Sequence, residues 1–83
     1  MYETVVSLES AHHIDMNCLA LIIQRVSEYD ATVYLEVAGR RANAKSLLGL
    51  MALPINGASE VKILAEGPEA SAAAAAVSKQ IQE

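Results

Sequence analysis

The chain has 83 residues, of which 53% are hydrophobic and 19% are charged, and its net charge is −4. This composition excludes a disordered acidic tail, which needs low hydrophobicity and high charge. The absence of a basic stripe argues against nucleic-acid binding through phosphate neutralisation. We expect residues 1–83 to form a single domain.

The first part of the chain predicts a strand, a loop and a helix. Residues 2–8 are β-branched and partly alternating, which favours a strand. Residues 9–13 are expected to form a loop. Asp15 then stands where the N-cap of a helix over residues 16–27 belongs. The predicted apolar stripe of this helix consists of Met16, Leu19, Ala20, Ile23 and Val26.

The middle of the chain predicts a hairpin followed by a short helix. Residues 32–37 favour a second strand, and Ala38-Gly39 is a two-residue turn in which glycine supplies the positive φ. Residues 40–44 form a weaker third strand. Ser46 is the natural N-cap of a helix predicted over residues 47–53.

This short helix carries more apolar side chains than one inward face can hold. At the angular spacing of an α-helix, Leu50 and Leu53 point inward together. The other apolar side chains diverge partly or wholly from that direction: Leu47, Leu48 and Met51. An exposed apolar patch beside a polar N-cap predicts a docking surface for another protein. The alternative is that loops cover these residues.

The last part of the chain predicts a fourth strand and a third helix. Residues 60–66 alternate, and Gly67-Pro68-Glu69 opens the helix, with proline tolerated in its first turn. The alanine-rich residues after it favour a helix packed closely on a sheet. The element order β-α-β-β-α-β-α predicts an α+β fold, with a four-stranded antiparallel sheet and three helices on one face.

The sequence gives little sign of redox, metal or membrane chemistry. The lone Cys18 fits a reducing compartment and is interpreted as a small apolar residue of the first helix. Two adjacent histidines, His12 and His13, are too few ligands for a metal site. Neither a signal peptide nor a membrane span is evident. We therefore expect a cytoplasmic protein with no metal, no cofactor and no membrane partner.

The most specific string is residues 45–53, Lys-Ser-Leu-Leu-Gly-Leu-Met-Ala-Leu. It resembles the regulatory-serine segment of HPr, the histidine-containing phosphocarrier protein of the bacterial sugar phosphotransferase system. The resemblance extends without gaps over essentially the whole chain, through these residues: Tyr29-Asp30, Leu35-Glu36, Gly39, Asn43, Lys45-Ser46, Gly49, Met51, Leu53 and Ala65-Glu66-Gly67. It implies the open-faced β-sandwich of that family and a protein that is not an enzyme.

The phosphorylation motif of the family, Gly-(Ile/Leu)-His-Ala-Arg-Pro, differs in this sequence. In the gapless match, Asp15 stands in the place of the histidine that carries the phosphoryl group. Asn17 stands in the place of the arginine that pairs with the phosphate, and an amide lacks the charged donor fork of a guanidinium. Phosphocarrier activity through a histidine at this position is therefore not predicted.

Asp15 and the neighbouring histidines leave alternatives open. Asp15 could simply cap the helix, accept a phosphoryl group as an aspartyl-phosphate, or imitate the charged, phosphorylated site permanently. A two-residue slip would bring His13 into the place of the nucleophile, but nothing resembling the arginine follows it. We interpret His12 and His13 as solvated loop residues.

Ser46 keeps the surroundings of the regulatory serine. The resemblance implies that a dedicated ATP-dependent kinase phosphorylates it, and that the phosphoprotein acts as a corepressor in carbon catabolite control. The catabolite-repression HPr homologues keep this serine and lack the histidine, but they retain the arginine and proline that are absent here. An unmodified helix N-cap is the other interpretation, and the two are compatible because phosphate is favoured at a helix N-terminus.

The leading hypothesis is a regulatory or interaction protein of the HPr family. Ser46 would be the modifiable residue, and a serine kinase and a transcriptional regulator would be its protein partners. The docking residues would be Leu47, Leu48 and Met51. A working phosphocarrier that uses His13 or Asp15 is one alternative, and a diverged structural relative with an unrelated partner is another.

Overall fold

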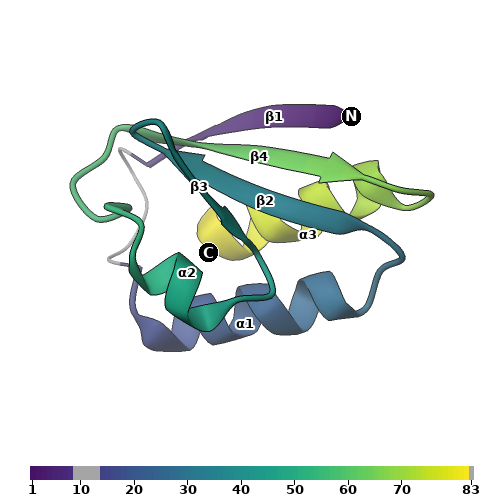
Figure 1. Ribbon diagram of the computed structural model, residues 1–83, viewed down its shortest axis with the longest axis horizontal. Helices are drawn as coiled ribbons and strands as arrows, with labels where there is room; N and C mark the ends of the chain where they lie inside the picture. Colours follow the sequence, from purple (N-terminus) through teal and green to yellow (C-terminus); the bar gives the residue numbers. More distant parts are fainter. Residues whose placement is uncertain (9–13, 83) are drawn as a thin grey trace.

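In the computed structural model, which describes residues 1–8 and 14–82, three helices cover one face of a four-stranded sheet (Figure 1). All neighbouring strands are antiparallel, in the order β1-β4-β2-β3. The predicted α+β fold is therefore confirmed. The elements are β1 (Tyr2–Ser7), α1 (Met16–Ser27), β2 (Thr32–Val37), β3 (Arg40–Asn43), α2 (Leu47–Met51), β4 (Glu60–Glu66) and α3 (Ala70–Gln82).

The predicted boundaries are confirmed where the local signals are strongest. Helix α1 and strands β2 and β4 begin and end at the expected residues. Helix α2 ends at Met51, two residues earlier than expected, and α3 begins at Ala70, so Pro68 lies before the helix rather than in its first turn. In the β2–β3 turn, Ala38 joins Gly39 at positive φ, with values of 53° and 79°. Positive φ at both central residues is the geometry of a type I′ hairpin.

The core is aliphatic and lies between the sheet and the helices. The inward side of β2 contributes Val33, Leu35 and Val37, each at most 1% exposed. Ala73 and Ala74 of α3 are fully buried, so their small side chains let this helix lie close to the sheet. The predicted close packing of the alanine-rich helix is confirmed.

The buried face of α1 differs from the predicted stripe. Leu19, Ile22 and Val26 are buried, whereas Met16 is 55% exposed and Ala20 is also exposed. Residues 19–23 are all apolar, so helical periodicity alone does not identify the buried side. Packing against α3 and α2 selects the face that contains Ile22.

The outer face of the sheet carries a ladder of alternating charges across all four strands. Arg41 of β3 lies 3.2 Å from Glu36 of β2, and Glu36 lies 4.0 Å from Lys62 of β4. Lys62 in turn lies 3.8 Å from Glu3 of β1. Opposite charges on neighbouring strands favour this pairing. The groups singled out by the sequence lie instead on the side of the helices.

Candidate functional site

Asp15 caps the first helix, as the sequence predicts. Its Oδ1 accepts the backbone N–H of Cys18 at 2.9 Å, and its carbonyl oxygen accepts the N–H of Leu19 at 3.1 Å. The backbone is extended at this residue, with φ −98° and ψ −178°. One carboxylate oxygen therefore satisfies a helix N–H that lacks an intrahelical partner.

The side chain of Asn56, which is distant in the sequence, holds the residue that precedes this cap. The N–H of Ile14 donates to Oδ1 of Asn56 at 2.8 Å, and Nδ2 of Asn56 donates to the carbonyl oxygen of Ile14 at 2.9 Å. Ile14 is itself 6% exposed, so burial and hydrogen bonding both hold the residue before Asp15. The sequence alone does not predict this role of Asn56, because its partner lies 42 positions away.

Ser46 caps the second helix in the same manner. Its Oγ accepts the N–H of Gly49 at 3.2 Å, and its carbonyl oxygen accepts the N–H of Leu50 at 2.9 Å. A Cβ added at Gly49 would lie 3.2 Å from Oγ of Ser46 and 3.3 Å from Cβ of Ala42. The absence of a side chain at Gly49 therefore lets α2 pack closely against β3 and keeps the serine hydroxyl over the first turn.

Exposed apolar side chains lie at the start of α1 and on α2. Leu48 is 80% exposed, Met16 is 55% exposed and Met51 is 48% exposed; we call these three residues the α1–α2 patch. Leu50 and Leu53 are buried, which confirms their predicted inward direction. A hollow of about 310 Å³ adjoins the patch, and its lining includes Asp15, Met16, Leu19, Met51 and Ile55.

Leu47 differs from the other two predicted docking residues. Its side chain is partly buried and packs against the core, whereas Leu48 and Met51 are exposed. Met16, which the sequence assigns to the core, contributes to the exposed surface instead. Of the three predicted docking residues, Leu48 and Met51 are therefore the accessible ones. Met16 is accessible as well, although the sequence did not predict it as a docking residue.

Cys18 is half-buried and packs against the core, as expected for a small apolar residue. Burial raises the pKa of its thiol, and the negative charge of Asp15 raises it further. Both effects disfavour the thiolate, which is the nucleophilic form of cysteine. His12 and His13, the second of which is the alternative nucleophile, belong to the expected loop of residues 9–13 and lie outside the described residues.

Within residues 1–8 and 14–82, no cluster of three or more His, Cys, Asp or Glu side chains is arranged to hold a metal ion. Over the same residues, no helix has both the length and the apolar character needed to cross a membrane.

Residues 2–83 match the family model described as the PTS HPr component phosphorylation site. The chain is 34% identical over 64 residues to HPr-like protein Crh of Bacillus subtilis, covering 77% of this chain and 75% of the relative. It is 38% identical over 63 residues to phosphocarrier protein HPr of Treponema pallidum, covering 76% and 72%. Phosphocarrier protein HPr of Bacillus anthracis is a structural relative with a TM-score of 0.87 and 28% identity, covering 98% and 96%.

Proposed function

The chain belongs to the HPr family of the bacterial phosphotransferase system, and from that membership we propose that it is a regulatory, protein-binding member. In this proposal it is not an enzyme and does not carry phosphoryl groups on a histidine. It acts as one HPr-like domain in the cytoplasm. Protein partners bind at the α1–α2 patch, and phosphorylation of Ser46 regulates that binding.

The cap of α1 is the observation that carries this proposal. A phosphocarrier needs a nucleophile that gives up its phosphoryl group readily and a cation that holds the phosphate. At the matching positions the chain has Asp15, whose carboxylate already binds the first turn of α1, and Asn17, which is neutral. The carboxylate thus occupies the end of the helix where an anion is most favoured.

Ser46 supports the regulatory part of the proposal. Ser46 is exposed, and its Oγ already lies over the first turn of α2. Phosphorylation would add a charge of about −1.5 to −2 beside backbone N–H groups, which is favourable at a helix N-terminus. We therefore expect the modification to change binding while the fold persists.

The position of Ser46 also indicates which partners respond to its modification. The phosphate would stand at the edge of the α1–α2 patch, because Leu48 lies two residues further along the chain. A partner with arginines around an apolar groove would gain charge-assisted hydrogen bonds, and an acidic partner would be repelled. A serine kinase and a transcriptional regulator are the partners that the family resemblance suggests.

Two phosphorylation assays run in parallel test the proposal. One uses phosphoenolpyruvate and the first enzyme of the phosphotransferase system, and the other uses ATP and the serine kinase. A working HPr serves as the positive control in both, and mass mapping locates each phosphate. We expect no phosphoryl transfer from phosphoenolpyruvate and a single phosphate on Ser46 from ATP, which Ser46→Ala abolishes.

Other results would identify the alternatives. Acid-labile label on His13, or hydroxylamine-sensitive label on Asp15, would make the chain a working phosphocarrier. If the chain stays unmodified by the kinase while HPr is phosphorylated, the regulatory role of Ser46 is wrong.

Restoring the missing groups one at a time tests the role of the phosphate clamp. We expect Asp15→His alone to restore little transfer, because Asn17 still supplies no guanidinium. Asp15→His with Asn17→Arg should accept more phosphate than either single variant. Equal transfer by Asp15→His and the double variant would contradict the importance of the cation.

A further inference from the structure

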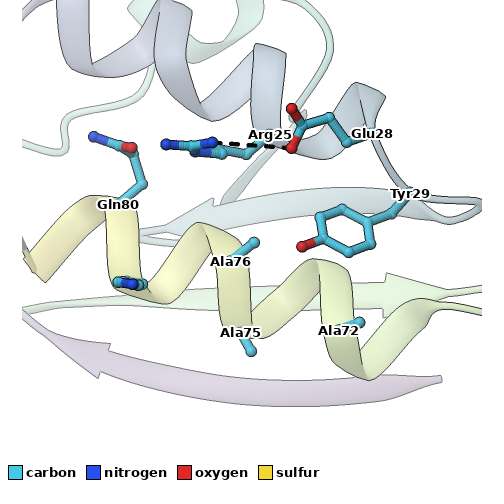
Figure 2. A pocket seen from close by; sticks show the side chains of 8 residues that line it. Arg25, Glu28, Tyr29, Ala72, Ala75, Ala76 and Gln80 are labelled. Atoms are coloured by element: carbon cyan, nitrogen blue, oxygen red, sulfur yellow. Dashed lines mark ion pairs between the residues drawn. The ribbon is translucent and has the colours of Figure 1, made fainter.

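A second concave surface lies between α1 and α3, formed by residues beyond the α1–α2 patch. It is a groove of about 510 Å³, and the α3 residues that line it include Ala72, Ala75 and Ala76 (Figure 2). The opposite wall is formed by Arg25 in the last turn of α1 and by Glu28 and Tyr29, which follow the helix. Figure 2 shows the tyrosine ring extending from the end of α1 toward α3. We call this surface the α1–α3 groove.

The charges of the groove contrast with those of the chain. The chain has a net charge of −4, yet both walls of the groove carry a cation, Arg25 on α1 and Lys79 on α3. Among residues 1–8 and 14–82, Glu28 is the only acidic residue that lines the groove. It lies 3.9 Å from Arg25, and both side chains are about half exposed, at 53% and 47%. An exposed pair of this kind is weak, so Arg25 can turn toward another carboxylate.

The shape of the groove suits an elongated occupant. Ala72, Ala75 and Ala76 recur at helical spacing and are followed on the same face by Lys79. Small side chains along a groove let a second helix approach within the usual packing distance of about 8–10 Å. Arg25 and Lys79 would then flank that helix on its two sides.

We propose that the α1–α3 groove binds an α-helix of a partner protein. The helix would place small or apolar side chains on the alanines and carboxylates beside Arg25 and Lys79. Because Met16 lies at the start of α1 and the groove uses its last turns, this helix would leave the α1–α2 patch free for another protein. The proposal stands independently of any phosphorylation of Ser46.

A titration with two designed peptides tests this surface. Both peptides are helical, with alanine and leucine on one face; the flanking positions are glutamate in one and lysine in the other. Backbone amide shifts of the ¹⁵N-labelled full chain are followed by NMR. We expect saturable shifts around Ala72, Ala75 and Arg25 with the glutamate peptide, and affinity at least about tenfold weaker with the lysine peptide, because like charges oppose binding.

Two matched variants separate groove binding from general charge effects. Ala75→Glu places a bulky acidic side chain in the groove, and Ala20→Glu places the same group on an exposed position of α1 outside the groove. Ala75→Glu should weaken the glutamate peptide at least about tenfold, while Ala20→Glu should leave its affinity within about twofold. The amide spectra of the free variants verify that both are folded.

Three kinds of result would overturn the proposal. The first is the absence of saturable shifts with the glutamate peptide. The second is equal affinity for the two peptides, or shifts centred on Leu48 and Met51 instead of the groove. The third is an equal effect of Ala75→Glu and Ala20→Glu.

Discussion

The starts of α1 and α2 share one capping geometry but differ in charge and in what anchors them. In each, a side-chain oxygen of the N-cap accepts an N–H three residues later, at 2.9 Å for Asp15 and 3.2 Å for Ser46. Asp15 introduces a carboxylate into the end of a helix of 12 residues, while Ser46 contributes a hydroxyl to a helix of five. One start is therefore charged without modification, and the other acquires charge only if its hydroxyl is modified.

The two helices also depend on different contacts. A helix of five residues is far too short to be stable in isolation, so α2 relies on its packing. That packing centres on Leu50, which is 1% exposed, and on the close approach at Gly49. Helix α1 instead buries three side chains and has its approach fixed by Asn56. The difference separates a long helix with a fixed start from a short helix placed by one buried side chain.

The largest expected effect comes from truncating Leu50, the buried side chain that anchors α2. Leu50→Ala should lower the free energy of unfolding by about 2–5 kcal/mol, because it removes most of a buried side chain and leaves a cavity. Leu48→Ala on the same helix is the control, since Leu48 is 80% exposed and its truncation should cost at most about 0.5 kcal/mol. Chemical denaturation measures both. Similar losses for the two variants would show that packing of Leu50 does not hold α2.

The next largest effect is expected from removing the hydrogen bonds that hold Ile14, which lies directly before the N-cap of α1. Asn56→Ala removes both hydrogen bonds to Ile14 and should lower the free energy of unfolding by about 1–3 kcal/mol. Asn56→Asp keeps an acceptor for the N–H of Ile14 but loses the donor to its carbonyl. Its loss should therefore be smaller. The rate of amide hydrogen exchange at Ile14 provides a local measurement. An unchanged rate in Asn56→Ala would show that the two hydrogen bonds from Asn56 do not hold Ile14.

A smaller effect compares the two caps directly. Asp15→Ala and Ser46→Ala should each cost about 0.5–2 kcal/mol, because each leaves one first-turn N–H without its side-chain acceptor. The carboxylate adds an attraction to the helix dipole of about 0.3–1 kcal/mol at low ionic strength. Asp15→Ala should therefore be the more destabilising of the two at low salt, and the two losses should converge at about 1 M salt.

Asp15→Ser isolates the contribution of charge in this comparison. It keeps a capping oxygen at α1 and gives it the chemistry found at α2. Its loss should lie below that of Asp15→Ala and should diminish as salt is added. A loss in Asp15→Ala that does not change with salt would show that the charge of Asp15 contributes little to the start of α1.

The sequence predicts these two starts because their signals are local. Asp15 and Ser46 stand next to the first turns that they cap, and the boundaries of β2 and β4 follow from the alternation of their residues. Whether Asp15 replaces a phosphoryl acceptor and whether Ser46 is modified stay predictions, because capping geometry is the same with or without those roles.

The features that the sequence does not predict depend on tertiary contacts. The two hydrogen bonds between Asn56 and Ile14 join residues 42 positions apart. The buried face of α1 is ambiguous because residues 19–23 are all apolar, and only packing against α3 and α2 selects Ile22. The α1–α3 groove likewise exists only because these two helices lie side by side, which no local pattern in either helix specifies.

The smallest expected effect is a shift in the pKa of Cys18, whose backbone N–H binds Asp15. A helix N-terminus by itself lowers a thiol pKa, but burial and the charge of Asp15 raise it here. Asp15→Ser should lower this pKa, because it removes a negative charge that opposes the thiolate while burial remains. The rate of alkylation by iodoacetamide across alkaline pH measures the shift, with Ser46→Ala as the control at the other helix start.

The same thiol gives the stability of the fold a defined dependence on pH. Because its pKa is higher in the folded chain than in the unfolded chain, the folded state holds more protons between those two values. The contribution of this thiol to the stability of the fold is therefore fully present below its pKa in the unfolded chain. It is lost as the pH rises through the pKa of the thiol in the folded chain. Cys18→Ala should remove this alkaline decline, and Asp15→Ser should reduce it only in part, since burial is the larger cause. An equally steep decline in Cys18→Ala would assign it to another group and remove Cys18 from the differences between the two helix starts.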